Sequence, residues 1–442
     1  MSDAPPSRII GSEMEYDLQC SEESVTKVIE KGFLAATGEP YPKDYSGFLV
    51  NGGRLYPDVN HIEYATPECL GGHQLMLAEH AGRMLVKEVV KQSKVPHNGL
   101  YDRAVAVDYL NGTAQLRTSG YHENYCIPND YAVRTRIKRF LPTFLASRAI
   151  WSGSGYLSHK GYQVSQKANG IGDDYAEGGG WVTTEGSKPM ILIIRDGGTP
   201  QFLRCEVRGM DPTRSWFAKE LGFDTTSLCL RLLEHPDERV RRGLPRFSKA
   251  YAELYKISYD TKATRLLNVE DGPESTAAEV QLRYAEAILD HATHPSIQLP
   301  PGELAAAYNF YAFAEELHTT VAKHAENLHL FKDRIDWIAR MATLRRRLGQ
   351  DCLMSVTPKG AYLDNLWDRI DTHDLGRLAF SEFLEDADIA EMERLQTMPP
   401  AGTRAAIRSN HLRSANKDSI REVYWESLVL GDEKLVSMPL IP

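Results

Sequence analysis

Residues 54–69 read RLYPDVNHIEYATPEC, and this stretch decides the fold that we predict for the chain. Its apolar and aromatic residues have the pattern of strand, but Asp58, His61, Glu63 and Glu68 lie among them. Acidic residues are depleted from ordinary strands. We therefore expect this part of the sheet to carry chemistry that needs a proton, a metal ion or a charged ligand.

Strand and helix patterns alternate on both sides of this stretch. Residues 8–17 (RIIGSEMEYD) alternate in the manner of a strand, and residues 24–36 and 73–92 have the pattern of helices. Asn51-Gly52-Gly53 predicts a turn that leads into the strand at residue 54.

The remainder of the chain divides into a strand-rich and a helix-rich part. Further segments are predicted as strands at 99–110, 119–128, 189–198 and 201–209, and as a helix at 134–152 that is broken or kinked at Pro142. After about residue 215 the pattern is largely helical. The order predicts an α+β fold in which an antiparallel sheet has helices on one face. We expect residues 1–355 to form a large domain and residues 356–442 to form a small C-terminal domain that ends in a short β element.

Composition limits the class of protein. The chain has 442 residues, of which 42% are hydrophobic and 25% charged, and a formal net charge of -9. This profile is typical of a soluble globular protein and argues against a nucleic-acid binder. No apolar run reaches membrane-spanning length, and the beginning, MSDAPPSRII, lacks the features of a signal peptide. We therefore expect a cytoplasmic location.

Glu13 and Glu15 are candidate metal ligands. Residues two apart on a strand point to the same face, so their carboxylates lie side by side and repel each other unless a cation compensates. A solvated strand face is the alternative, but apolar residues flank the pair. Glu63 can join them, and an all-oxygen ligand set suits Mg²⁺.

Asp58 is the candidate acid–base residue. It follows a proline, so its backbone is fixed, and an aspartate near a metal can act as base or nucleophile. The alternative role is a turn cap. On an extended backbone His61 and Glu63 share one face, and we expect Asp58 on the opposite face or near a bend. Glu68 is expected to be structural.

Two weaker candidates for nucleotide or substrate binding follow. In YHENY (121–125) His122 and Asn124 share one face of a strand, although a single histidine in a sheet is more often structural. In the loop SGSG (152–155) the backbone N–H groups, with Ser154 among them, can approach a phosphate.

Three arginines near strand ends are also candidates. Arg195 ends the strand ILIIR, and Arg204 and Arg208 lie on the next one. Arginines in such positions recognise phosphate or carboxylate groups, with surface ion pairs as the equally weighted alternative.

The order of these motifs resembles a known family. IIGSEMEYD, NGGRLYPDVNHIEYATPEC, SGYHENY, FLASRAIWSGSGYL and YQVSQKAN follow one another, and MPPAGTRAAIRSNHL and WESLVLGDEKLVSMPLIP come near the end. The chain is similar to the Pup ligase and Pup deamidase/depupylase family, which is related to glutamine synthetase and other carboxylate–amine ligases. The resemblance implies a curved antiparallel sheet of the glutamine synthetase-like type that binds ATP and Mg²⁺.

The resemblance also implies roles for residues. Glu13, Glu15 and Glu63 would be metal ligands, Asp58 the catalytic residue of the RLYxD motif, and His122 a group at the nucleotide or metal. The implied reaction transfers a phosphoryl group from ATP to a carboxylate, which an amine then attacks. The acid would be a small molecule or a Pup-like tail.

Two other functions fit the same residues. One is hydrolysis of an amide or isopeptide bond with nucleotide retained, as in the deamidase. The other is a non-catalytic relative that kept the nucleotide pocket, which the presence of all four acidic residues disfavours. The insertion typical of the deamidase is absent between the first two motifs, so ligation is the favoured interpretation.

Overall fold

The computed structural model describes most of the chain. The described residues are 7–20, 24–43, 46–110, 113–178, 188–195, 200–349, 353–372, 375–380, 385–414, 420–430 and 435–437.

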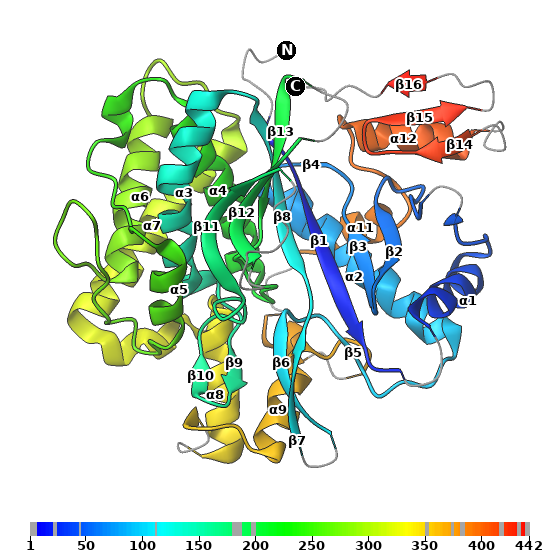
Figure 1. The fold of residues 1–442 in the computed structure, drawn as a ribbon, viewed down its shortest axis with the longest axis horizontal. Coiled ribbons are helices and arrows are strands. Elements are labelled where there is room, and N and C mark those ends of the chain that lie inside the picture. Colours follow the sequence, from blue (N-terminus) through cyan, green and yellow to red (C-terminus); the bar gives the residue numbers. More distant parts are fainter. Residues whose placement is uncertain are drawn as a thin grey trace.

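A mixed sheet forms the centre of the molecule (Figure 1), in the order β11-β12-β13-β8-β1-β3-β2. These strands are β1 Ile9–Leu18, β2 Arg54–Asp58, β3 His61–Ala65, β8 Tyr121–Pro128, β11 Ile171–Glu177, β12 Lys188–Ile194 and β13 Phe202–Val207. Neighbours along this path are antiparallel, except that β11 and β12 are parallel. Two short strands, β4 (Cys69–Leu70) and β5 (Leu100–Tyr101), also pair with β1.

Strand β1 lies between the two polar motifs of the sequence. In its register Glu15 is opposite Glu63 of β3, while Glu13 is opposite His122 of β8. Alternate residues of β1 are buried, and Met14 belongs to the core. The glutamates therefore occupy the face of the sheet that is turned away from the main core.

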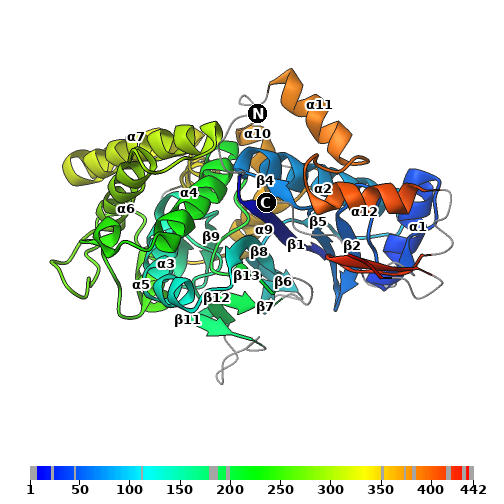
Figure 2. The same cartoon turned by 90° about the horizontal axis from the view of Figure 1, so that it is seen from above.

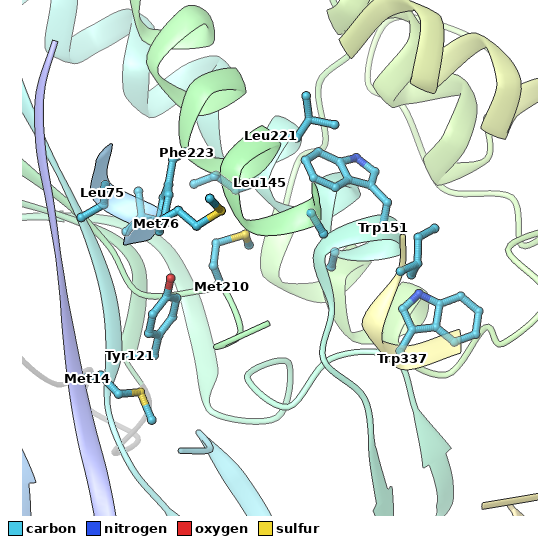
Figure 3. Close-up of a cluster of buried hydrophobic side chains, with 14 of the residues drawn as sticks. Met14, Leu75, Met76, Tyr121, Leu145, Trp151, Met210, Leu221, Phe223 and Trp337 are labelled. Carbon is cyan, nitrogen blue, oxygen red and sulfur yellow. The ribbon is translucent and has the colours of Figure 1, made fainter. Parts of the chain in front are cut away.

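Helices cover the core face of the sheet. Three of them are α2 (Gly72–Ser93), α3 (Tyr131–Ser152) and α4 (Trp216–Glu234), and Figure 2 shows them on one side of the strands. Figure 3 shows Met14 and Tyr121 of the sheet facing Met76, Phe223 and other apolar side chains of this layer. The predicted arrangement, an antiparallel sheet with helices on one face, is confirmed.

The other elements surround this centre. The remaining helices are α1 Val25–Thr37, α5 Ala250–Ser258, α6 Ala277–Ala292, α7 Pro301–His324, α8 Asp336–Leu348, α9 Pro358–Asp368, α10 Leu375–Ala379, α11 Asp386–Leu395 and α12 Arg404–Arg413, with 3₁₀ turns η2 Glu238–Arg241 and η3 Ala325–Asp333. Two hairpins, β6 (Val105–Leu110) with β7 (Thr113–Thr118) and β9 (Tyr156–Ser158) with β10 (Gly161–Gln163), lie at the end of the sheet where β1 stops (Figure 1). No described helix is long and apolar enough to cross a membrane.

Helix α3 runs through Pro142 without interruption, so of the two predicted outcomes, a break or a kink, the break is wrong and the kink stays a prediction. Proline removes one backbone hydrogen bond from a helix interior. Every residue from 140 to 152 is buried, and this burial outweighs the lost bond.

The chain after residue 355 contributes to two apolar clusters. Trp367, Ile370 and Met392 belong to the main core. A small second cluster combines Phe48 with Leu412 of α12 and with β14 (Ile420–Val423) and β15 (Ser427–Leu430), to which β16 (Leu435–Ser437) pairs. The division of the chain at residue 355 stays a prediction.

Candidate active site

Three carboxylates meet on the face of the sheet opposite the core. Glu15 of β1, Asp58 at the end of β2 and Glu63 of β3 each present an oxygen, and these oxygens lie within 4.8 Å of one another. Glu63 is buried, whereas Glu15 and Asp58 are half-buried. Such a group repels itself and is stabilised by a cation or a proton.

The electrostatics of Glu63 report this repulsion. Burial raises its pKa to about 8, and the charges of Glu13, Glu15 and Asp58 act in the same direction, against a hydrogen bond from the Tyr56 hydroxyl. Glu63 is therefore largely protonated at neutral pH until a cation is bound.

Asp58 reaches the group through a hairpin. It is paired with His61 across a two-residue loop in which Val59 has a φ of 48°. Directly opposed residues share a face, so Asp58, His61 and Glu63 are on the same side of the sheet. The expectation that Asp58 lies on the opposite face is wrong, and the expected bend is present.

Glu13 belongs to a second, adjacent group. Its carboxylate contacts His122 Nδ1 at 3.3 Å and accepts a hydrogen bond from Arg204 at 3.1 Å. Glu206 lies 3.6 Å from the same histidine nitrogen, and Arg204 also donates to the Asn124 side-chain oxygen. Asp58, and not Glu13, therefore completes the tightest carboxylate group among the described residues.

His122 is held neutral. Burial lowers its pKa to about 3, and the nearby cations Lys167, Arg208 and Lys188 act in the same direction, while Glu206 opposes them. Its Nε2 atom is buried with no hydrogen-bond partner among the described residues. A neutral imidazole with one free nitrogen can accept a hydrogen bond or bind a metal.

Three other predicted residues lie outside these groups. Ser154 is fully buried, and its backbone N–H donates to Asp211 at 2.9 Å. Arg195 is exposed directly after β12 and makes no ion pair with a described residue. Arg208 is buried and donates to Glu206, so it reaches the site through that carboxylate. Their roles in binding stay predictions.

An apolar pocket lies beside Glu13, at the end of the sheet where β1 begins. Ile9, Ile10, Phe202 and Leu203 line it, and Trp425 comes from the loop after β14. The polar residues that line the same pocket include Ser12, Glu13, Thr66, Glu68, Asn124, Arg204 and Arg404.

Glu68 attaches the C-terminal elements to this pocket. Its buried carboxylate accepts hydrogen bonds from Arg404 at 2.5 Å and from Arg408 at 2.7 Å, both on α12. Figure 1 shows α12 and the C-terminal strands beside the beginning of β1. The expected structural role of Glu68 is consistent with these contacts, although its partners are more than 330 residues away in sequence.

Sequence reasoning missed several residues of the site. Lys167 and Asp211 are buried near it, and Arg404 and Trp425 line the pocket. The segment YQVSQKAN, which contains Lys167, contributed to the resemblance, but no pattern in it distinguishes the lysine. Only the fold brings these residues together.

Known proteins match this chain over most of its length. The family model described as Pup-ligase protein matches residues 26–429. A Pup–protein ligase of Acidimicrobium ferrooxidans is 30% identical over 450 residues, which cover 96% of this chain and 93% of that one. A Pup–protein ligase of Corynebacterium diphtheriae is 28% identical over 443 residues, with 93% and 86% covered.

Solved structures share the fold. A complex between the prokaryotic ubiquitin-like protein Pup and its ligase PafA matches with a TM-score of 0.78 at 21% identity, covering 99% of this chain and 90% of that one. PafA in complex with ADP matches with a TM-score of 0.70 at 22% identity, covering 89% and 86%. The ligase interpretation of the sequence therefore holds over the hydrolase alternative, and the chain is a ligase that belongs to the Pup-ligase family.

Proposed function

We propose that this ligase uses ATP and Mg²⁺ to activate a carboxylate of a Pup-like protein and joins it to an amine of a target. The observation that carries the proposal is the meeting of Glu15, Asp58 and Glu63 on the same sheet as an apolar pocket, which Glu13 lines. Relatives that are Pup–protein ligases, and the Pup complex of PafA, support the choice of substrate.

The carboxylates fit a magnesium ion. Mg²⁺ is bound by a few carboxylate oxygens together with phosphate oxygens, and Glu13, Glu15 and Glu63 would hold it here. The raised pKa of Glu63 supports this, because a bound cation would remove the repulsion that keeps the proton in place. Bound Mg²⁺ supplies positive charge that offsets the charge of the transferring phosphoryl group.

The apolar pocket fits a nucleotide. Its apolar residues Ile9, Phe202 and Trp425 suit an aromatic base, and Arg204, which also lines the pocket, donates to Glu13. A nucleotide bound with its base in the pocket would direct its phosphates toward the carboxylates. The ADP complex of the structurally similar PafA supports nucleotide binding in this fold.

The chain's own residues then have defined tasks. In the first step a carboxylate oxygen of the substrate attacks the γ-phosphorus, the bond to ADP breaks, and an acyl phosphate forms. In the second step the amine nitrogen attacks the acyl carbon and phosphate leaves. Asp58 accepts the proton of the ammonium group, because only the neutral amine is a nucleophile.

The stoichiometry of ATP consumption and amide formation tests the proposal. The purified protein is incubated with Mg-ATP, lysine and a Pup-like peptide that ends in glutamate, and ADP, phosphate and amide are quantified, with D58N as control. We expect equal amounts of the three products and their loss in the variant. Retained nucleotide without net consumption, together with cleavage of a conjugated or glutamine-ended peptide, would overturn the proposal in favour of a hydrolase.

A further inference from the structure

Lys167 is held rigidly near the carboxylates although the proposed mechanism gives it no task. It follows β10 in a loop whose backbone is fixed by the buried carboxylate of Asp211. That carboxylate accepts hydrogen bonds from the backbone N–H groups of Lys167 at 3.0 Å and Gln166 at 2.8 Å, and from the Ser165 hydroxyl at 3.0 Å. These hydrogen bonds therefore fix the position of the Lys167 backbone, from which the side chain extends.

The ammonium group of Lys167 is buried and poorly satisfied. The residue is 8% exposed, and its one hydrogen bond within the described chain goes to the Ser119 carbonyl oxygen at the long distance of 3.4 Å. No described carboxylate lies within ion-pair distance of it. An ammonium group has three donors, and burying a charge without partners is costly.

A second unused donor lies beside it. The hydroxyl of Ser119 is buried and has no hydrogen-bond partner among the described residues. A buried ammonium group with one long hydrogen bond beside a buried hydroxyl with none is uncommon in folded proteins, where buried polar groups are nearly always paired. Together they indicate an oxygen-rich ligand.

The cationic surroundings indicate that this ligand is an anion. Burial lowers the pKa of Lys167 to about 8, and Lys188 acts in the same direction, against the charges of Glu15 and Asp211. Arg208 adds further positive charge. An anion at this place would offset the positive charge of the Lys167 ammonium group, which makes no ion pair with a described carboxylate.

The position of Lys167 relative to the carboxylates of the site indicates which anion binds there. Ser119 precedes Gly120, and a Cβ atom on Gly120 would lie only 2.2 Å from Glu15 Oε1. The lysine thus lies just past Glu15, on the β8 side of β1, whereas Asp58 approaches Glu15 from the β3 side. The apolar pocket lies at the other end of β1, around Ile10. At about 3.3 Å per residue, Ile10 and Glu15 are separated by roughly 16 Å along the strand.

We propose that the Lys167 ammonium group and the Ser119 hydroxyl bind the reacting carboxylate of the substrate and the acyl phosphate formed from it. The inference rests on the proposed function and adds to it the subsite for the acid. Lys167 stays protonated throughout and donates hydrogen bonds. The bond that forms joins the carboxylate oxygen to phosphorus, and the bond that breaks releases ADP. Asp58, on the other side of Glu15, is then placed to deprotonate the amine that attacks this acyl group.

Binding without turnover tests the subsite. The probes are a Pup-like peptide ending in glutamate, the same peptide ending in glutamine, and ADP, each titrated with Mg²⁺ present against wild type, K167M, K167R and S119A. We expect K167M to weaken binding of the glutamate peptide about 10- to 100-fold, which is the range for a hydrogen bond to a charged group. S119A should weaken it less, K167R should retain much of it, and ADP affinity should stay within about twofold.

The matched control is K160M, which removes an exposed lysine from the turn of the β9–β10 hairpin and should leave all three affinities unchanged. The inference is overturned if K167M weakens the glutamate and glutamine peptides equally, or if ADP binding falls as much as peptide binding. The second result would assign Lys167 to the nucleotide phosphates. Failure of the wild type to form amide with ATP would refute the proposed function, yet the peptide titrations would still decide the subsite.

Discussion

Glu15 and Glu63 are directly opposite each other on β1 and β3, with Asp58 near both. Like charges in directly opposed strand positions are destabilising. The sheet therefore loses stability at this place, and a bound cation would recover it. Each carboxylate comes from a different strand, so this repulsion acts between neighbouring strands of the central sheet.

The pH dependence of the unfolding free energy of the metal-free protein should reveal this repulsion. The pKa of Glu63 is raised from its ordinary value to about 8. An acid whose pKa is raised by folding binds more protons in the folded state than in the unfolded state. Its contribution to the free energy of unfolding is therefore fully present below its ordinary pKa and is lost as pH rises through about 8. We expect the unfolding free energy of wild type to fall relative to E63Q between pH 5 and pH 8, by on the order of 2–4 kcal/mol.

Urea unfolding at several pH values, with and without Mg²⁺, measures this difference. The matched control is E393Q, because Glu393 is exposed on α11. Mg²⁺ should restore wild type at pH 8 and leave E63Q nearly unchanged. Parallel pH curves for wild type and E63Q would contradict the prediction.

Gly120→Ala should impair metal binding more than stability. The added Cβ would lie 2.2 Å from Glu15 Oε1, and the end of a side chain can move away where backbone cannot. We expect a displaced Glu15, an apparent Mg²⁺ affinity reduced about 10-fold or more, and a small change in melting temperature. Titration of Mg²⁺ against ADP binding measures the first quantity.

A second glycine provides the control for this substitution. Gly272 has only an ordinary contact at 3.6 Å, to Val269, so G272A should leave Mg²⁺ affinity unchanged. A G120A protein that unfolds at much lower temperature but binds Mg²⁺ normally would show that Gly120 serves packing instead.

The sequence could predict the parts of the site that follow strand periodicity. Glu13 and Glu15 share a face because they are two apart on β1, and the apolar residues around them identify the strand. The position of Asp58 could not be predicted, because the β2–β3 loop contains Val59 with positive φ instead of the glycine that normally indicates such a turn. Which strand lies opposite which, and so whether Glu13 or Asp58 joins Glu15, depends on the register of the sheet.

Other parts of the site depend on contacts distant in sequence. Lys167 is one lysine in a loop, and what distinguishes it is that it is buried and makes no ion pair with a described carboxylate. The pairing of Glu68 with Arg404 and Arg408 spans most of the chain. Neither feature has a local pattern that a single sequence can display.

Asp58→Asn should abolish amide formation without abolishing nucleotide binding. Loss of a general base typically reduces the rate by 10²–10⁴-fold, and asparagine cannot accept the ammonium proton. We expect a kcat reduced to this extent with lysine as the amine. Hydroxylamine, which is already neutral at pH 7, should restore much of the rate because it does not need the base.

Comparison of the two amines separates two roles for this carboxylate. A carboxylate oxygen of Asp58 lies within 4.8 Å of oxygens of Glu15 and Glu63, so all three are placed to bind one metal ion. The alternative effect of the substitution is therefore a loss of Mg²⁺ affinity. Mg²⁺ affinity in the presence of ADP measures that loss. A large fall in Mg²⁺ affinity with no rescue by hydroxylamine would make Asp58 a ligand and not the base.

Disrupting the contact between Glu68 and α12 should weaken nucleotide binding from a distance. Burial by itself raises the pKa of Glu68, but Arg408 and Arg404 outweigh it and lower the pKa below its ordinary value. The contact is therefore fully stabilising above the ordinary pKa of a glutamate and is lost as pH falls through the lowered value. Removing one partner of a buried pair costs about 3–5 kcal/mol, so E68Q should be markedly less stable than wild type at pH 7.

The same variant should lose ADP affinity, since Arg404 and Trp425 line the pocket and depend on α12 for their position. Its matched control is E391Q, which breaks the half-exposed pair of Glu391 with Arg394 on α11 and should cost under about 1 kcal/mol. Urea unfolding and ADP titration of both variants decide the matter. The prediction is contradicted if E68Q is no less stable than E391Q and binds ADP normally. In that case the apolar cluster, and not the ionic contact to Glu68, holds the C-terminal elements against the sheet.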